Sequence, residues 1–424
     1  MPVLGEPAPV ADVWGHPTWP ARPAPLAGPP AVGGGRAPLA CLASAWGSHA
    51  LGMSVRQVPT LRVTAHPLTG KRMINDYVVD GDLGRGSFGN VKLAHDDRTG
   101  ECVAIKIVQR EAPRRLGVPY TPRKTDERLV REIRAMSRCQ DPHVVQLYEV
   151  IDDPNSRRLF LVLEYMPGGA LVWQDTLQRP ALTFNDTRYI MRGVTEGLAS
   201  LHACGVIHRD IKPANILLAD DGMPKISDFG CAYVRPTLGT AETLSSATDP
   251  LLARTFGTPS FFAPELCRDA SQGPPVTKAI DVWALGATLY CLLFGHPPFW
   301  ADTEYLLLEC ILHDDYAIPA TMGVDGRPIG PRPPRWPSHH ATGPASSLRP
   351  RSDEAEITTH LLDRLLDKDP RTRLTLDEAL LHPFLAAGPP SRVSSDDRLG
   401  PDSSFRTTSQ PSIGSSPARH RPWH

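Results

Sequence analysis

One short run of residues constrains this chain more than any other feature. The run is His208-Arg209-Asp210-Ile211-Lys212-Pro213-Ala214-Asn215, which places a carboxylate, an ammonium group and an amide within a single loop. Asp210 would orient an acceptor hydroxyl and accept its proton, Lys212 would neutralise charge on a phosphate, and Asn215 would hold a magnesium ion. The run therefore favours phosphoryl transfer, and an ordinary polar loop after a strand is the alternative interpretation.

A glycine-rich segment precedes this loop and is typical of a phosphate-binding turn. Its sequence is Leu83-Gly84-Arg85-Gly86-Ser87-Phe88-Gly89-Asn90-Val91, and glycines let backbone N–H groups approach phosphates closely. A dinucleotide-binding turn would require a helix straight afterwards. Here two apolar-rich runs flank the turn at 97–100, which predicts a β-hairpin instead. A Walker-type loop is excluded because no Lys-Ser/Thr pair follows the last glycine.

Lys106 lies inside the apolar strand Val103-Ala104-Ile105-Lys106. A buried lysine needs a partner. Glu132 borders the apolar face of a helix that the periodicity predicts near Asp126–Cys139, so it can point inward at Lys106. Glu127 is the competing carboxylate, and a surface lysine on an edge strand is the alternative interpretation of Lys106.

Two further residues complete the predicted phosphoryl-transfer site. The carboxylate of Asp228, in Asp228-Phe229-Gly230, comes shortly after Asn215 and is expected to chelate magnesium. Thr258 is expected to support Asp210 and Lys212 by hydrogen bonding, with an ordinary turn residue as the alternative. Two other carboxylates are given structural roles: Glu265 in an ion pair with Arg373, and Asp281 as an acceptor for backbone N–H groups of the loop 208–215.

These motifs, taken in order, make residues 71–386 resemble the eukaryotic protein kinase family. The closer resemblance is to calcium/calmodulin-dependent protein kinase kinases and their fungal relatives, which act upstream of AMP-activated or sucrose-non-fermenting-type kinases. The segments that carry it are 67–71, 144–155, 257–265 and 279–286. The resemblance implies an α+β, bilobal fold with a small β-rich N-lobe (about 71–165) and a larger, mostly α-helical C-lobe (about 166–386).

The same resemblance implies ATP and Mg²⁺ as cofactors, Ser/Thr protein kinase activity and a hinge at 163–166. The residues expected to bind nucleotide are Leu83, Gly84, Gly86, Ser87, Phe88, Gly89, Val91, Ala104, Lys106, Glu164, Met166 and Leu217. The catalytic set is Asp210, Lys212, Lys106, Glu132 and Thr258, and the metal ligands are Asn215 and Asp228. In the activation segment, Arg254 stands where many kinases carry their activating hydroxyl, and Thr255 is the nearest hydroxyl.

Composition separates the ends of the chain from residues 67–386, the predicted kinase domain. Residues 1–66 are rich in Pro, Ala and Gly, and residues 387–424 are rich in Ser, Arg and Pro. Both segments are expected to be disordered because they bury little apolar surface. A third irregular stretch, about 320–352, contains prolines that forbid a helix. Its segment 333–337 is interpreted as part of an uncommitted loop insertion, with a polyproline docking strip as the alternative.

Charge and cysteine content indicate which partners and which cellular compartment to expect. With 45 basic and 46 acidic residues, the chain offers no electrostatic reason to propose nucleic-acid or membrane binding. The 8 cysteines are scattered without a C-x-x-C pair, which indicates a reducing compartment: the cytoplasm, with the nucleus as a second location. The tail from residue 388 has too few apolar residues for a calmodulin-binding helix, so calmodulin control is not expected.

Three functions remain, and the partners expected in each are proteins. The leading hypothesis is a Ser/Thr kinase that phosphorylates the activation loops of downstream kinases in an energy- or stress-signalling cascade. The second is an active kinase with unrelated protein substrates. The third is a catalytically inactive scaffold, against which the presence of Lys106, Glu132, Asp210, Asn215 and Asp228 argues.

Overall fold

The computed structural model describes residues 55–86, 89–109, 124–235, 251–252, 255–268, 273–330 and 354–386. Its N-terminal part is built on one eight-stranded sheet in the order β1-β7-β8-β6-β5-β4-β3-β2. β1 pairs with β7 in parallel, and the other pairs are antiparallel. The strands are β1 (Arg56–Val58), β2 (Val63–Ala65), β3 (Arg72–Ile74), β4 (Tyr77–Gly86), β5 (Gly89–Asp96), β6 (Cys102–Gln109), β7 (Leu147–Ile151) and β8 (Arg158–Glu164).

The hydrophobic pattern explains the centre of this sheet and the helix beside it. β6 is flanked by β5 and β8 and is buried from Val103 to Val108, as expected of a strand rich in valine and isoleucine. The helix α2 (Lys124–Arg138) buries Leu129, Ile133 and Met136, which lie on one helical face. It contacts β7 of the sheet and the short helix η2 (Phe229–Cys231), so it joins the sheet to the loop that carries Asp228.

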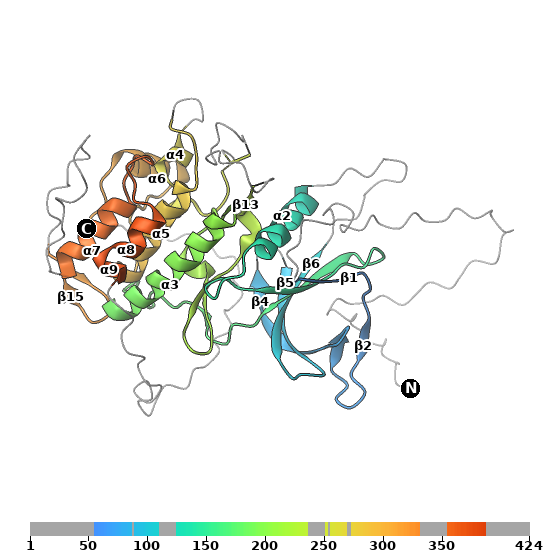
Figure 1. The fold of residues 1–424 in the computed structure, drawn as a ribbon. Coiled ribbons are helices and arrows are strands. Elements are labelled where there is room, and N and C mark those ends of the chain that lie inside the picture. The colour runs from blue at the N-terminus through green and yellow to red at the C-terminus, as the bar shows by residue number, and fades with distance from the viewer. Residues whose placement is uncertain are drawn as a thin grey trace, which may run out of the picture. The chain divides into compact units, whose positions relative to one another are not determined.

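The C-terminal part is mostly helical (Figure 1). Its central helix is α5, in which every residue from Ile280 to Phe294 is buried. Across the described ranges, no helix combines the length and the apolar character needed to cross a membrane. The helices are α3 (Phe184–Ala203), α4 (Pro264–Cys267), α5 (Ala279–Phe294), α6 (Glu304–His313), α7 (Glu354–Leu365), α8 (Leu376–Leu381) and α9 (Pro383–Ala386).

Short strand pairs hold the loops that carry the predicted catalytic residues. β10 (Val206–Ile207) pairs with β13 (Tyr233–Val234). β11 (Ile216–Leu218) pairs with β12 (Pro224–Ile226) and with β9 (Gly169–Ala170). The loop 208–215 therefore runs between two paired strands, and Asp228 closely follows a third.

The predicted elements are present with small shifts of their ends. The helix expected near Asp126–Cys139 is α2, the expected hairpin around the turn at 97–100 is β5–β6, and the expected strand of Lys106 is β6. The small β-rich lobe and the larger helical lobe agree with the predicted α+β, bilobal class.

The structure differs from the sequence-based boundaries in two places. Residues 55–66 were expected to be disordered, but they form β1 and β2, because pairing with β7 and β3 satisfies their backbone groups. In the stretch about 320–352, Thr321–Met322 and Arg327–Pro328 form the hairpin β14–β15. The rest of that stretch from 331, the terminal segments 1–54 and 387–424, and Arg254 lie outside the described residues.

Candidate active site

The loop 208–215 is anchored by Asp281, a fully buried residue of α5. Its carboxylate accepts 2.8 Å hydrogen bonds from the backbone N–H groups of His208 and Arg209, and it lies 2.8 Å from Nε2 of His202. Burial raises the pKa of Asp281, but the hydrogen bond and charge of His202 bring it below its ordinary value. The predicted anchoring role is therefore confirmed, and it holds Arg209 at φ +65°, a conformation uncommon for non-glycine residues.

The Asp210 carboxylate is held by three side chains. The Thr258 hydroxyl donates to Asp210 Oδ1 at 2.8 Å, Lys212 Nζ donates to Oδ2 at 2.8 Å, and Lys212 Nζ also donates to Thr258 Oγ1 at 2.6 Å. Asn215 Nδ2 donates to Oδ2 at 3.0 Å. The contacts predicted for Thr258 are present, and the carboxylate is fixed as a hydrogen-bond acceptor.

Asn215 and Asp228 provide a donor set that fits Mg²⁺. Asn215 donates through its Nδ2 to the backbone oxygen of Asp210 at 2.8 Å, so its amide oxygen points away and accepts no hydrogen bond from a described residue. Asp228 adopts φ +60°, and its side chain is one-third exposed. An amide oxygen and a carboxylate are the hard oxygen ligands that Mg²⁺ prefers.

Lys106 and Glu132 form a buried ion pair between β6 and α2. Lys106 Nζ also lies 3.9 Å from Asp228 Oδ1, so one ammonium group links the helix to the predicted metal site. Phe229, next to Asp228, is fully buried in η2, which packs against α2. The Lys106 partner is therefore Glu132 as predicted, and the side chain of the competing Glu127 lies outside the described residues.

The glycine-rich segment lies where β4 pairs with β5, and it is followed by the predicted hairpin of β5 and β6 around the turn at 97–100, not by a helix. A Cβ built on Gly84 would meet no atom within 4 Å, whereas one built on Gly89 would collide with the Ile107 carbonyl oxygen of β6. Contact with β6 thus explains why position 89 is a glycine. The open space at Gly84 has no such explanation and fits a phosphate-binding backbone. Ser87 and Phe88 lie outside the described residues.

The remaining residues predicted to contact nucleotide come from five segments. Met166 follows the end of β8, and its carbonyl oxygen accepts a 3.0 Å hydrogen bond from the Gly169 N–H. Leu217 lies on β11 of the small sheet. The other predicted contacts are Leu83 on β4, Gly86 at the end of β4, Val91 on β5, Ala104 on β6 and Glu164 at the end of β8.

The hinge contains a contact that the sequence did not reveal. Lys225 on β12 donates to the Glu164 carboxylate at 2.6 Å, and the Gln146 N–H donates to the same carboxylate at 3.2 Å. Both partners are distant in sequence from Glu164. A lysine in a short strand does not by itself predict an ion pair with the hinge. The side chain of Glu164 therefore ties the hinge to the C-lobe, independently of its backbone groups.

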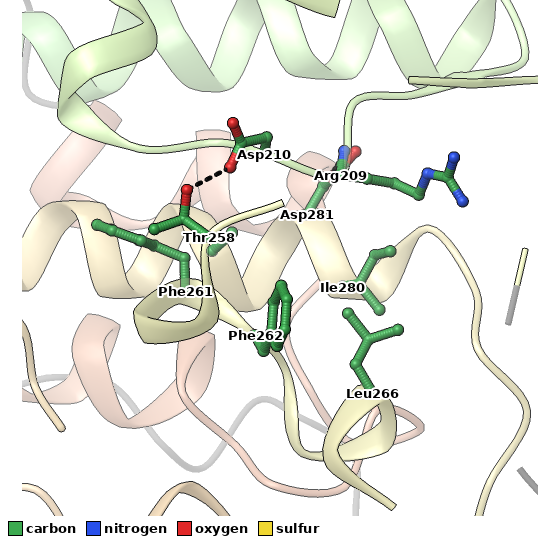
Figure 2. A pocket seen from close by; sticks show the side chains of 9 residues that line it. Arg209, Asp210, Thr258, Phe261, Phe262, Leu266, Ile280 and Asp281 are labelled. Carbon is green, nitrogen blue, oxygen red and sulfur yellow. Dashed lines mark hydrogen bonds between the residues drawn. The ribbon is translucent and has the colours of Figure 1, made fainter. Parts of the chain in front are cut away.

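A small pocket adjoins Asp210 (Figure 2). Thr258 and Asp210 meet at one side of it, and apolar side chains form much of the rest, namely Phe261, Phe262, Leu266, Ile280 and Ala284. The segment that carries these phenylalanines is anchored by the predicted ion pair, in which Arg373 donates to Glu265 at 2.7 and 2.9 Å. The pocket is little larger than a water molecule, so it lies where the segment 258–266 packs on α5 and does not itself hold a substrate chain.

Comparison with known families agrees with this geometry. The protein kinase domain family matches residues 77–385. The chain belongs to the protein kinase family.

Similar proteins support this family assignment and include Ser/Thr kinases of fungi and plants. The chain is 40% identical over 338 residues to serine/threonine-protein kinase ssp1 of Schizosaccharomyces pombe, covering 79% of this chain and 46% of the relative. It is 36% identical over 356 residues to SNF1-activating kinase 1 of Saccharomyces cerevisiae, covering 78% and 30%. For serine/threonine-protein kinase GRIK2 of Arabidopsis thaliana the identity is 33% over 316 residues, covering 74% and 67%. The chain thus spans less than half the length of the two fungal relatives.

Proposed function

We propose that this chain is an ATP-dependent Ser/Thr protein kinase that phosphorylates the activation loops of downstream protein kinases. The observation that carries the proposed chemistry is the fixed Asp210 carboxylate, with Thr258 on Oδ1 at 2.8 Å and Lys212 on Oδ2 at 2.8 Å. These contacts hold the proposed proton acceptor in a fixed position, with Thr258 beside it (Figure 2).

Each polar residue of the site has a role in this proposal. Asp210 would orient the acceptor hydroxyl and take its proton, and Lys212 would place positive charge beside the transferring phosphate. Lys106, held by Glu132, would position the phosphates from the N-lobe side. Asn215 and Asp228 would hold Mg²⁺, which supplies charge neutralisation on the phosphates.

Specificity for serine and threonine rests on the position of Lys212, two residues after Asp210. The compact ammonium group lies beside the point where a short acceptor side chain would be placed. The finer assignment, to activation loops of kinases in energy or stress signalling, rests on similarity to SNF1-activating kinase 1 and on the resemblance to kinase kinases.

The test is a reaction of the purified full chain with MgATP and an inactivated SNF1-type kinase. We expect phosphate on the activation loop of that substrate, located by mass spectrometry, and loss of transfer by about 100-fold or more with Asp210→Asn. Near-full turnover by Asp210→Asn would reject the catalytic assignment. Phosphorylation of generic proteins without phosphorylation of the kinase substrate would reject the substrate assignment and favour unrelated substrates.

A further inference from the structure

Three large apolar side chains are exposed around the start of α6. Trp300 is 73% exposed, Tyr305 is 70% exposed and Leu306 is 48% exposed. Tryptophan is highly buried on average, so a mostly exposed tryptophan followed five residues later by a mostly exposed tyrosine is informative. We call Trp300, Tyr305 and Leu306, with the neighbouring Asp302 and Glu304, the α6 surface.

The α6 surface is built on rigid structure. Phe299, directly before Trp300, is buried and stacks on the ring of Trp283 at a centroid distance of 6.0 Å. The hydroxyl of Thr303 caps α6 by accepting a hydrogen bond from the Leu306 N–H at 3.3 Å, and Leu307 on the same helix is buried. The exposed side chains are therefore presented by a fixed backbone, which lowers the entropy lost on binding.

The position of α6 connects this surface to the pocket beside Asp210. α6 contacts both η3 (Pro259–Phe261) and α4. Phe261 of η3 and Leu266 of α4 line the pocket in Figure 2. A protein that places its hydroxyl at Asp210 can thus reach the α6 surface with a neighbouring part of its own fold.

Charge restricts the partner further. Residues 300–315 contain five carboxylates and no Lys or Arg. Asp302, Glu304 and Asp314 are exposed, so this segment is acidic, and the cation Lys368 lies over the Phe299 ring and donates to the Asp314 carbonyl oxygen. The complementary surface combines an apolar side chain with Lys or Arg.

We propose that the α6 surface docks the folded protein substrate, through an apolar and basic patch that lies beside the phosphorylated loop of that substrate. The proposal rests on the proposed kinase function and extends it from Asp210 to a second contact. A short peptide reaches only Asp210 and its surroundings, whereas a folded substrate also reaches the α6 surface. Docking therefore affects the KM for protein substrates and leaves peptide phosphorylation unchanged.

The experiment compares two substrates: an inactivated SNF1-type kinase, and a synthetic peptide with the sequence of its activation loop. The full chain is assayed as wild type, as Trp300→Ala/Tyr305→Ala and as Asp302→Lys/Glu304→Lys. Leu381→Ala on α8 is the matched control, because Leu381 is also apolar and is 81% exposed. Thermal unfolding of each variant establishes that it is folded.

We expect both double variants to lower kcat/KM for the kinase substrate by about tenfold, mostly through KM, and to leave peptide kinetics and Leu381→Ala unchanged. Equal losses on protein and peptide, or no loss on the protein, would overturn the docking surface while the wild-type rates still support the kinase function. If wild type phosphorylates neither substrate, the proposed function fails and the docking surface fails with it.

Discussion

Thr258 donates a 2.8 Å hydrogen bond to Oδ1 of Asp210 although 48 residues separate them. The same hydroxyl accepts from Lys212 Nζ at 2.6 Å. The segment that contains Thr258 is thereby connected, through one hydroxyl group, directly to the residue proposed to accept the proton.

Replacing Thr258 should show how much its hydroxyl contributes to catalysis. Thr258→Ala removes a hydrogen bond to a charged group, and we expect kcat to fall by about 10- to 100-fold. Thr258→Ser retains the hydroxyl and should restore most of the rate. Steady-state kinetics on one peptide measures both variants, and an alanine variant as active as the serine variant would contradict the role of the hydroxyl.

The turn before Thr258 is predicted to tolerate only glycine. Gly257 has φ +113°, and a Cβ there would collide with the carbonyl oxygen of Arg209. Gly257→Ala should lower the free energy of unfolding by about 1–3 kcal/mol and reduce kcat. Gly222→Ala is the control, because Gly222 also has positive φ but its Cβ would meet no atom. Urea denaturation measures the free energy of unfolding of both variants. An equal loss of this free energy in the two variants would mean that the contact with the Arg209 carbonyl oxygen is unimportant.

Local patterns predicted the elements around the candidate site because residues close in sequence carry the signal. The loop 208–215 anchored by Asp281, the hairpin around the turn at 97–100 and the helix α2 all follow from short patterns. The ion pair of Glu265 with Arg373 spans 108 residues and was also predicted, although no local pattern pairs the two residues. Strand β1 was missed because three residues carry no periodic signal, and its pairing depends on β7.

The contact of Lys225 with Glu164 belongs to the same class of missed features. It joins the hinge to β12 at 2.6 Å, and neither residue predicts the other. Lys225→Met should leave the Glu164 carboxylate without this cation and loosen the hinge. We expect the KM for ATP to rise by about threefold to tenfold with a small change in kcat. ATP titrations at saturating peptide test this, and a changed kcat with unchanged KM for ATP would argue against a hinge role.

A histidine pair, in which His382 is buried and His360 partly buried, should make stability depend on pH. His360 Nδ1 lies 2.9 Å from His382 Nε2, and the rings stack. Burial, followed by the charges of His360 and Arg364, lowers the pKa of His382 to about 4. Burial and Arg364 also lower the pKa of His360, and Asp363 opposes this shift.

The sign of the effect follows from proton uptake. Between about pH 6.5 and pH 4 the unfolded chain binds more protons at His382 than the folded chain, so stability falls as pH falls through this range. We expect the Tm of wild type to drop between pH 6.5 and 5. His360→Gln, which removes one charge from the pair, should show a smaller drop. If Tm falls equally with pH in wild type and in His360→Gln, the histidine pair is not the cause of the pH dependence.

Threonine should be preferred over serine as the phosphate acceptor. Cys231 directly follows Asp228-Phe229-Gly230, and its carbonyl oxygen accepts a 2.7 Å hydrogen bond from Arg209 Nε, which places the residue beside the loop that carries Asp210. In kinases that this chain resembles, large side chains at this position go with serine and compact ones with threonine. Cysteine is close to valine in size and leaves room for the threonine methyl group.

The measurement uses two peptides that differ only in the acceptor residue. Wild type should give the higher kcat/KM for the threonine peptide, and Cys231→Leu should shift the ratio toward serine because the larger side chain occupies the space of the methyl group. Cys231→Val is the matched control and should keep the threonine preference, since its volume is similar. A wild-type preference for serine that Cys231→Leu leaves unchanged would show that the residue only packs beneath the activation segment and does not select the acceptor.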